Sequence, residues 1–126
     1  MLIIKPIENK DDQKRICGEC GVVYRADAMA YSAEDDGKLI GICQFGIGDG
    51  EGYVYDLCCV PGVDDFEALF IMGRQTLNFI DLSGTHKAVF CGDESRLTKA
   101  IGFKSKDGAL VFDLEGFFES PCSHKK

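Results

Sequence analysis

The sequence predicts an α/β (α+β) fold in which a mixed, mostly antiparallel sheet has helices on both faces. Residues 53–60 form an apolar run typical of a buried strand, Pro61-Gly62 interrupts it, and residues 66–80 place apolar side chains at helical spacing. Strands joined by turn residues precede this unit, and a second crossover follows it. Hairpins combined with strand–helix–strand crossovers give a sheet of mixed direction.

The first predicted elements are a strand and a helix. Residues 2–7 alternate loosely between apolar and polar side chains, which favours a strand. Asn9 or Asp11 then offers a side-chain oxygen that caps a helix N-terminus, and Gly18 or Gly21 ends that helix. Before the next strand, the chain leaves room for at most one further helical turn.

Two strands and a glycine-rich link come next. Residues 28–33 and 38–47 are predicted strands, joined by a turn over 34–37 with Asp-Gly at its tip. The link at 46–52 has glycine at alternate positions, but it contains two acidic residues, lacks lysine and precedes a strand instead of a helix. It therefore predicts a flexible hairpin loop and not a phosphate-binding loop.

The C-terminal part is predicted as a strand, a short helix and a final hairpin. The long helix ends near Asp81, and a tail from Glu115 to Lys126 is expected to form a last edge segment. The elements between them are strand 87–91, a helix capped by Asp93 or Ser95 that ends near Ile101, strand 103–105, a turn at 106–108 and strand 109–114.

Length and composition limit the class of protein. The 126 residues are enough for one domain, residues 1–126, and 45% hydrophobic with 28% charged residues is typical of a globular protein. The net charge of −7 disfavours nucleic-acid binding, which requires a basic surface. We find no run long enough to span a membrane and no signal-peptide core, which predicts a cytoplasmic protein.

Seven cysteines are the other compositional signal. Their odd number and the absence of an export signal argue against a disulfide framework. Cys17 and Cys20 form a CxxC, but the pair lies at the end of a predicted helix, where no helix N-terminus lowers a thiol pKa. A zinc site needs a second ligand pair, for which only Cys122 and His124 are available. We therefore predict reduced, metal-free thiols.

Three segments resemble the GNAT family of acetyl-CoA-dependent N-acyltransferases. The run Leu-Cys-Cys-Val-Pro at 57–61, the helical run at 72–80 with its Asn-Phe ending, and Lys-Ala-Ile-Gly-Phe-Lys at 99–104 are similar to that family's central strand, core helix and last helix. In order and spacing of elements, the resemblance covers residues 2–118. It implies a GNAT-like fold, acetyl-CoA as the cofactor, and an amine, on a small molecule or a protein, as the acyl acceptor.

The family's pyrophosphate loop, Arg/Gln-x-x-Gly-x-Gly/Ala, is altered in this chain. Aligned on the proline, its three defining positions fall on Asp64, Glu67 and Leu69. The glycines of that loop let backbone N–H groups approach phosphate oxygens, and Asp64 reverses the charge of the first position. These residues predict weak acetyl-CoA binding. Leu57 and Cys59 match the strand positions whose backbone groups hold pantetheine in the family.

The resemblance also assigns proton-transfer groups. Asp56 is the only carboxylate on the strand where family bases often lie, so it is the candidate base, although a surface aspartate is the simpler alternative. The family's acid, a tyrosine four residues before Gly-Phe, falls on Thr98, whose hydroxyl is too weak an acid. Tyr55 is the candidate substitute. His86 is predicted to be a solvated loop residue.

Two functions follow as alternatives. One is a GNAT-like N-acyltransferase of unknown substrate with a degenerate acyl-CoA loop, and the other is a non-catalytic GNAT-fold module that binds a small ligand or a protein. Apolar residues near the C-terminus, Phe112, Phe117 and Phe118, either cover the sheet or form a homodimer contact.

Overall fold

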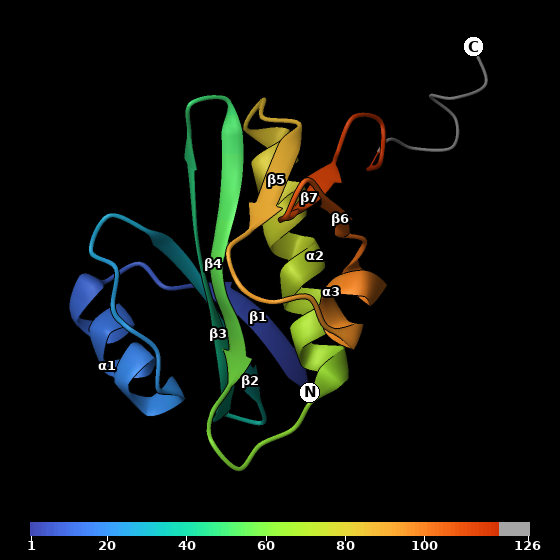
Figure 1. Ribbon diagram of the computed structural model, residues 1–126. Coiled ribbons are helices and arrows are strands. Elements are labelled where there is room, and N and C mark those ends of the chain that lie inside the picture. Colours follow the sequence, from blue (N-terminus) through green and yellow to red (C-terminus); the bar gives the residue numbers. More distant parts are fainter. Residues whose placement is uncertain (119–126) are drawn as a thin grey trace.

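The computed structural model describes residues 1–118 and shows a seven-stranded sheet with helices on both faces (Figure 1). The strands lie in the order β1-β2-β3-β4-β5-β7-β6, and every neighbouring pair is antiparallel except β4 and β5. The predicted fold class is therefore confirmed. The elements are β1 (Leu2–Pro6), α1 (Lys10–Cys20), β2 (Met29–Asp35), β3 (Lys38–Gly48), β4 (Glu51–Cys59), α2 (Phe66–Leu82), β5 (Lys87–Phe90), α3 (Arg96–Ile101), β6 (Lys104–Lys106) and β7 (Ala109–Asp113).

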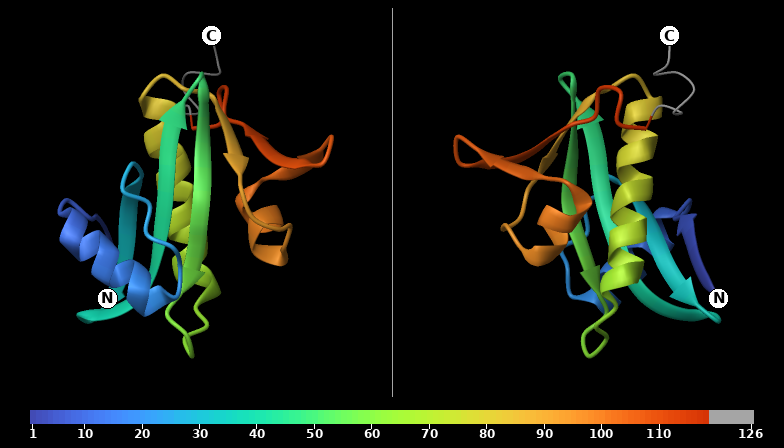
Figure 2. Two further views of the ribbon diagram at one scale, coloured as in Figure 1. Left: turned by 60° about the vertical axis from the view of Figure 1, so that its left-hand side comes forward. Right: turned by 90° about the vertical axis from the view of Figure 1, so that its right-hand side faces the viewer.

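The helices are divided unequally between the two faces of the sheet. Figure 2 shows α2 and α3 on one face and α1 alone on the other. Contacts with β2, β3 and β4 place α2 across the middle of the sheet, whereas α1 contacts β3. We refer to these as the α2 face and the α1 face. None of the helices in residues 1–118 is both long and apolar enough to span a membrane.

Local capping fixes the first helix. The Asn9 side chain accepts hydrogen bonds from the backbone N–H groups of Asp11 and Asp12, at 2.7 and 3.2 Å. Gly21 ends the helix in the left-handed conformation, with φ of 74°, where the lack of a Cβ removes the strain. Of the alternatives that the sequence left open, Asn9 and Gly21 are the caps, and residues 22–28 form a loop.

The α2 helix packs its apolar stripe on the sheet, with β4 in the centre. Met72, Leu77 and Ile80 are fully buried, as their spacing predicts. Phe66, Leu69 and Phe70, which we expected in the same contact, are only partly buried, and of these Leu69 and Phe70 pack at the edge of this core. The α2 face therefore forms the main hydrophobic core of the molecule.

The C-terminal segment differs from the prediction. Residues 115–118 form a turn, in which the Phe117 N–H donates to the Leu114 carbonyl, and do not extend the sheet. The edge strand is β6 instead. Phe112 is buried and covers the sheet, whereas Phe117 is 43% exposed. The rest of the predicted edge segment lies outside the described residues.

Candidate active site

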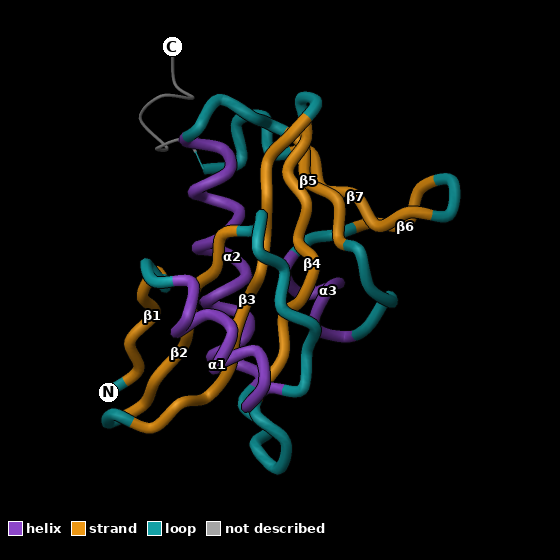
Figure 3. Tube along the Cα trace, turned by 90° about the vertical axis from the view of Figure 1, so that its left-hand side faces the viewer, coloured by secondary structure: helices purple, strands orange, loops and turns teal. Residues whose placement is uncertain are grey.

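The two parallel strands at the centre of the sheet separate part of the way along their length. The β4 strand pairs with β5 only from Gly52 to Val54, and a last hydrogen bond runs from the Cys91 N–H to the Val54 carbonyl at 2.9 Å. Since β5 ends at Phe90, residues 56–59 of β4 have a ladder partner only on the β3 side (Figure 3). Backbone hydrogen-bonding groups on the open side are therefore available to a ligand.

A β-bulge lies at the point where the strands separate. Gln44 of β3 is opposite Asp56, but the next residue, Phe45, is opposite Val54, so Tyr55 is the extra residue. Before the bulge Val54 faces the α2 core, and after it Leu57 does so. Tyr55 and Asp56 both lie on the α1 face, where their contacts are with β3 and the loop after α1.

Two buried glutamines hold the bulged part of β4 in place against the loop after α1. The Gln44 amide donates to Asp56 Oδ2 at 2.7 Å and to the Val23 carbonyl at 2.9 Å. Gln44 Oε1 accepts from Gln13 Nε2 at 3.0 Å and from the Arg25 backbone N–H at 3.1 Å. Gln13 Nε2 also lies 3.2 Å from the Arg25 carbonyl. Both glutamines are essentially inaccessible to solvent, and the network fixes the loop after α1 against β4.

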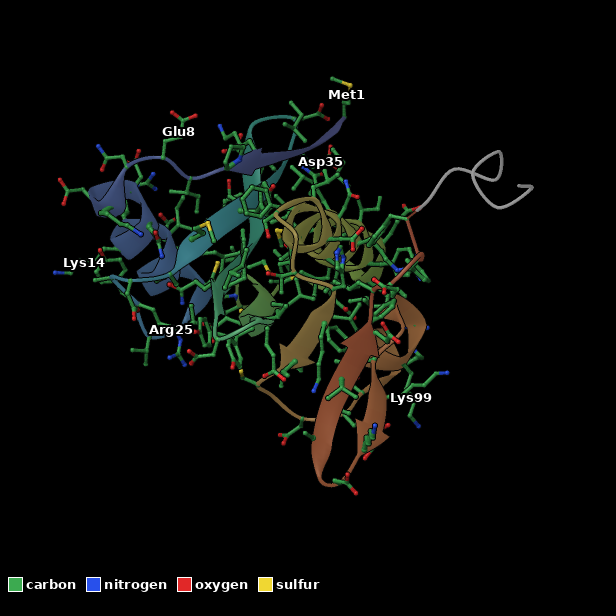
Figure 4. All side chains as sticks on the ribbon, turned by 90° about the horizontal axis from the view of Figure 1, so that it is seen from above. Met1, Glu8, Lys14, Arg25, Asp35 and Lys99 are labelled. Atoms are coloured by element: carbon green, nitrogen blue, oxygen red, sulfur yellow. The ribbon has the colours of Figure 1, made fainter. Side chains whose placement is uncertain are left out.

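Arg25 adds a charged group to the same point. Its guanidinium carbon lies 4.6 Å from the centre of the Tyr55 ring, and its Nε lies 3.6 Å from Asp56 Oδ2. The arginine side chain is 43% exposed and that of Asp56 is 19% exposed, so both reach solvent. Figure 4 shows Arg25 near the end of α1. A carboxylate and a cation thus lie together at the mouth of the split.

The Tyr55 hydroxyl and Thr98 are placed less favourably for proton transfer. A Cβ on Gly46 would lie 3.3 Å from the Tyr55 hydroxyl, so this group lies over β3 and not in the split. Thr98 is buried, and its hydroxyl accepts from the Ser95 N–H in the capping box of α3. Thr98 is therefore used in helix capping.

The start of α2 carries the residues aligned with the pyrophosphate loop. Asp65 caps the helix by accepting from the Ala68 N–H at 3.0 Å. Asp64 and Glu67 are exposed, and Leu69 packs at the edge of the core. The sequence did not predict a cation here, yet the guanidinium of Arg96, from the first turn of α3, lies 4.0 Å from the Phe66 ring centre.

The strand positions expected to hold pantetheine differ in burial. Leu57 is buried and lies against α2 near Gly73, while Cys59 is partly buried and burial raises the pKa of its thiol. Their side chains point to the α2 face, so their contribution to a ligand would come from the backbone.

The CxxC thiols lie in a buried cluster between α1 and the sheet, next to β4. Cys17 and Cys20 face inward from α1, and the Cys58 thiol lies 3.9 Å from the Cys20 carbonyl. Burial raises the pKa of Cys20 to about 12 and that of Cys58 to about 11. Within residues 1–118 no three metal-ligating side chains are grouped for an ion. Cys122 and His124, the second ligand pair considered above, lie outside the described residues.

The residues predicted from the sequence did not include Gln13, Gln44 or Arg25, although the two glutamines carry a signal. Gln13 falls on the inner face of α1 with Ile16 and Cys17, and Gln44 interrupts an apolar run of β3. A polar residue at a core position indicates a buried hydrogen-bond partner. Arg25 has no such signal, since its loop position alone is compatible with solvent exposure.

Comparisons with known proteins define the fold. No protein-family model and no curated protein matches the sequence. Solved structures do match: a GNAT family acetyltransferase from Brucella melitensis in complex with acetyl-CoA has a TM-score of 0.70 and 16% identity over 95% of this chain and 90% of that one. An IAA acetyltransferase from Bacillus cereus has a TM-score of 0.72 and 13% identity over 90% of this chain and 100% of that one.

A third match is an acetyltransferase from Bacillus subtilis in complex with CoA, with a TM-score of 0.67 and 14% identity over 90% of this chain and 99% of that one. Together these structures show that the chain has the fold of the GNAT acetyltransferases. At such low identity, the likeness extends to the fold and no further.

Proposed function

We propose that this chain binds an acyl-CoA in the split between β4 and β5 and transfers the acyl group to an amine. One observation supports this most strongly: β4 loses its β5 partner after Val54, where two buried glutamines hold Asp56 at the opening. Structures with this fold have been determined with acetyl-CoA and with CoA, and they are named as acetyltransferases.

In this mechanism the unpaired backbone of Leu57 and Cys59 holds the pantetheine arm. The amine nitrogen attacks the thioester carbonyl carbon, the carbon–sulfur bond breaks, and the CoA thiolate leaves. Asp56 takes the proton that the nitrogen loses, directly or through water. Its described hydrogen bond and ion pair both use Oδ2, so Oδ1 is the acceptor. The thiolate takes its proton from solvent, and Tyr55 would act as the acid only through water, because its hydroxyl lies over Gly46.

The start of α2 is expected to weaken cofactor binding. Asp64 and Glu67 place negative charge where the diphosphate would lie, and Asp65 already occupies the Ala68 N–H. Arg96 is near enough to offset part of this repulsion. The acidic residues should lower acetyl-CoA affinity by about 100-fold relative to a loop with arginine and glycines.

The same feature favours a second candidate, a non-catalytic module that has kept the fold and binds a small ligand or a protein. Carboxylates at a helix N-terminus stabilise the helix itself, and they carry no cost in a chain that binds no diphosphate there. The single domain, the homodimer contact and the cytoplasmic location remain predictions from the sequence.

The test combines calorimetry with acetyl-CoA and an acyl-transfer screen over amine acceptors, using wild type and Asp56→Asn side by side. We expect the substitution to reduce turnover by about 10²- to 10⁴-fold and to leave acetyl-CoA affinity unchanged. Robust transfer that survives Asp56→Asn would remove Asp56 from the mechanism. If the wild type neither binds acetyl-CoA nor transfers, the module is the better description.

A further inference from the structure

The backbone of Arg25, a loop residue, is fixed by hydrogen bonds to two buried side chains. Both of its backbone polar groups are bonded to buried glutamines: its N–H donates to Gln44 Oε1, and its carbonyl accepts from Gln13 Nε2. Burying amide side chains is unfavourable unless every group is satisfied, so this network requires all of its partners. The result is a loop residue whose position relative to β4 is fixed.

The Arg25 side chain is oriented as well. The ring of Tyr55 supports the guanidinium at 4.6 Å, and Asp56 contacts only its Nε, at 3.6 Å. Within residues 1–118 no hydrogen bond or ion pair uses the two terminal nitrogens. A guanidinium supported in this way presents a planar pair of donors that matches a carboxylate.

Asp56 and Arg25 are neighbours, so one small acceptor can contact both. In the proposed transfer the amine of the acceptor lies at Asp56. A second group of the same acceptor molecule, within a few ångströms of that amine, would then contact Arg25. In an α-amino acid the nitrogen and the carboxylate carbon are ~2.5 Å apart, which fits this spacing. From these contacts we infer that the acceptor is a free amino acid, with Arg25 binding its carboxylate. This inference rests on the proposed acyl transfer.

The experiment compares each common α-amino acid with its own amide as acceptor, in wild type, Arg25→Gln and the control Arg15→Gln. Arg15 is another exposed arginine. It lies on α1, where it is paired with Glu19. The amide keeps the size of the acceptor and removes the negative charge, and it also resembles the N-terminal residue of a peptide. Dividing the wild-type preference by the variant's preference cancels the different reactivity of the two amines.

We expect Arg25→Gln to lower kcat/KM for amino acids by about 10- to 100-fold more than kcat/KM for the amides. The Arg15→Gln protein should match wild type. An equal loss for amino acids and amides would overturn the inference, because it would mean that Arg25 only positions Asp56. A preference for amides that Arg25→Gln leaves intact would also overturn it, in favour of a peptide or protein acceptor.

A binding measurement separates this inference from the proposed function. In the nitrogen-15 labelled protein, the Arg25 side-chain Nε–H resonance is followed while glycine or glycinamide is added. A saturable shift with glycine and none with glycinamide would support the inference even if no acyl transfer were found. Identical behaviour with both compounds would overturn it, whatever the fate of the acyl-CoA proposal.

Discussion

The two faces of the sheet differ in the kind of side chain that they bury. On the α2 face, Met72, Leu77 and Ile80 pack in an apolar core, and the buried polar side chains contributed by α2 and α3 are the small ones of Thr76 and Thr98. On the α1 face, Gln13 and Gln44 are buried equally deeply, and their hydrogen bonds fix the loop after α1 and the carboxylate on β4. Apolar burial gives more stability than buried polar groups do, whereas polar networks define position. The α2 face therefore stabilises the fold, and the α1 face positions the site.

The largest expected effect concerns the Cys20 thiol on the α1 face. It tests whether this thiol is as inaccessible to solvent as the α2 core. Burial raises the pKa of Cys20 to about 12, so little reactive thiolate forms at pH 8. Alkylation of Cys20 by iodoacetamide should be about 100- to 1,000-fold slower in the folded protein than in urea. Exposed Cys91 serves as the control, and mass spectrometry follows both. Rapid labelling of Cys20, or one stoichiometric zinc ion, would contradict this.

Truncation in the α2 core should show where stability comes from. Leu77 is fully buried, so Leu77→Ala should lower the free energy of unfolding by about 2–5 kcal/mol. Leu82 lies on the same helix but is 77% exposed, and Leu82→Ala should change stability by less than about 0.5 kcal/mol. Urea denaturation gives both values. Similar values for the two variants would remove the distinction between the core and the outer surface of α2.

Replacing Gln44 should show whether the glutamine network positions the site in addition to stabilising the fold. Gln44→Leu leaves the Arg25 N–H without its acceptor and the Val23 carbonyl without its donor, which should lower the free energy of unfolding by about 1–3 kcal/mol. Ile42→Val, a substitution in the same strand, should lower it by about 0.5–1.5 kcal/mol. We expect only Gln44→Leu to reduce acyl transfer or the amino-acid preference. Equal function in both variants would show that the network does not position the site.

The smallest effect lies away from both faces, at the end of α2. A hydrogen bond of 2.6 Å between Asp81 and His86 Nδ1 raises the pKa of His86 above its usual value of 6.5. The protonated form is thus favoured in the folded state, so its contribution to stability is present below pH 6.5 and is lost as the pH rises through the folded pKa. An NMR titration should show the raised pKa, and Asp81→Asn should lower it.

The sequence predicted those features that depend on neighbours along the chain. Asn9 caps α1 through residues two and three positions away, and the spacing of Met72, Leu77 and Ile80 follows from helical periodicity. Such interactions involve short stretches, so a local pattern is enough to predict them. The central position of the strand after the Gly-rich link follows from the same apolar pattern.

The candidate site depends on contacts between distant segments, which no local pattern defines. Gln13 and Gln44 are 31 positions apart, and Arg25 meets Tyr55 across 30 positions. The stacking of Arg96 on Phe66 is of the same kind. Asp56 could be named as a candidate because it is the only carboxylate of its strand after the first residue, but its partners depend on how the loop after α1 folds against β4.

The extra residue in β4 has a consequence for how this strand can change in evolution. Val54 faces the α2 core and Asp56 the α1 face, so removing Tyr55 would leave a strand that alternates without interruption. A homologue one residue shorter here could therefore keep both faces and the aspartate, and would lose only the ring that supports Arg25. Any further single deletion would turn Leu57 toward the glutamines. The bulge thus allows this strand to lose one residue, at the expense of the acceptor site that we propose at Arg25.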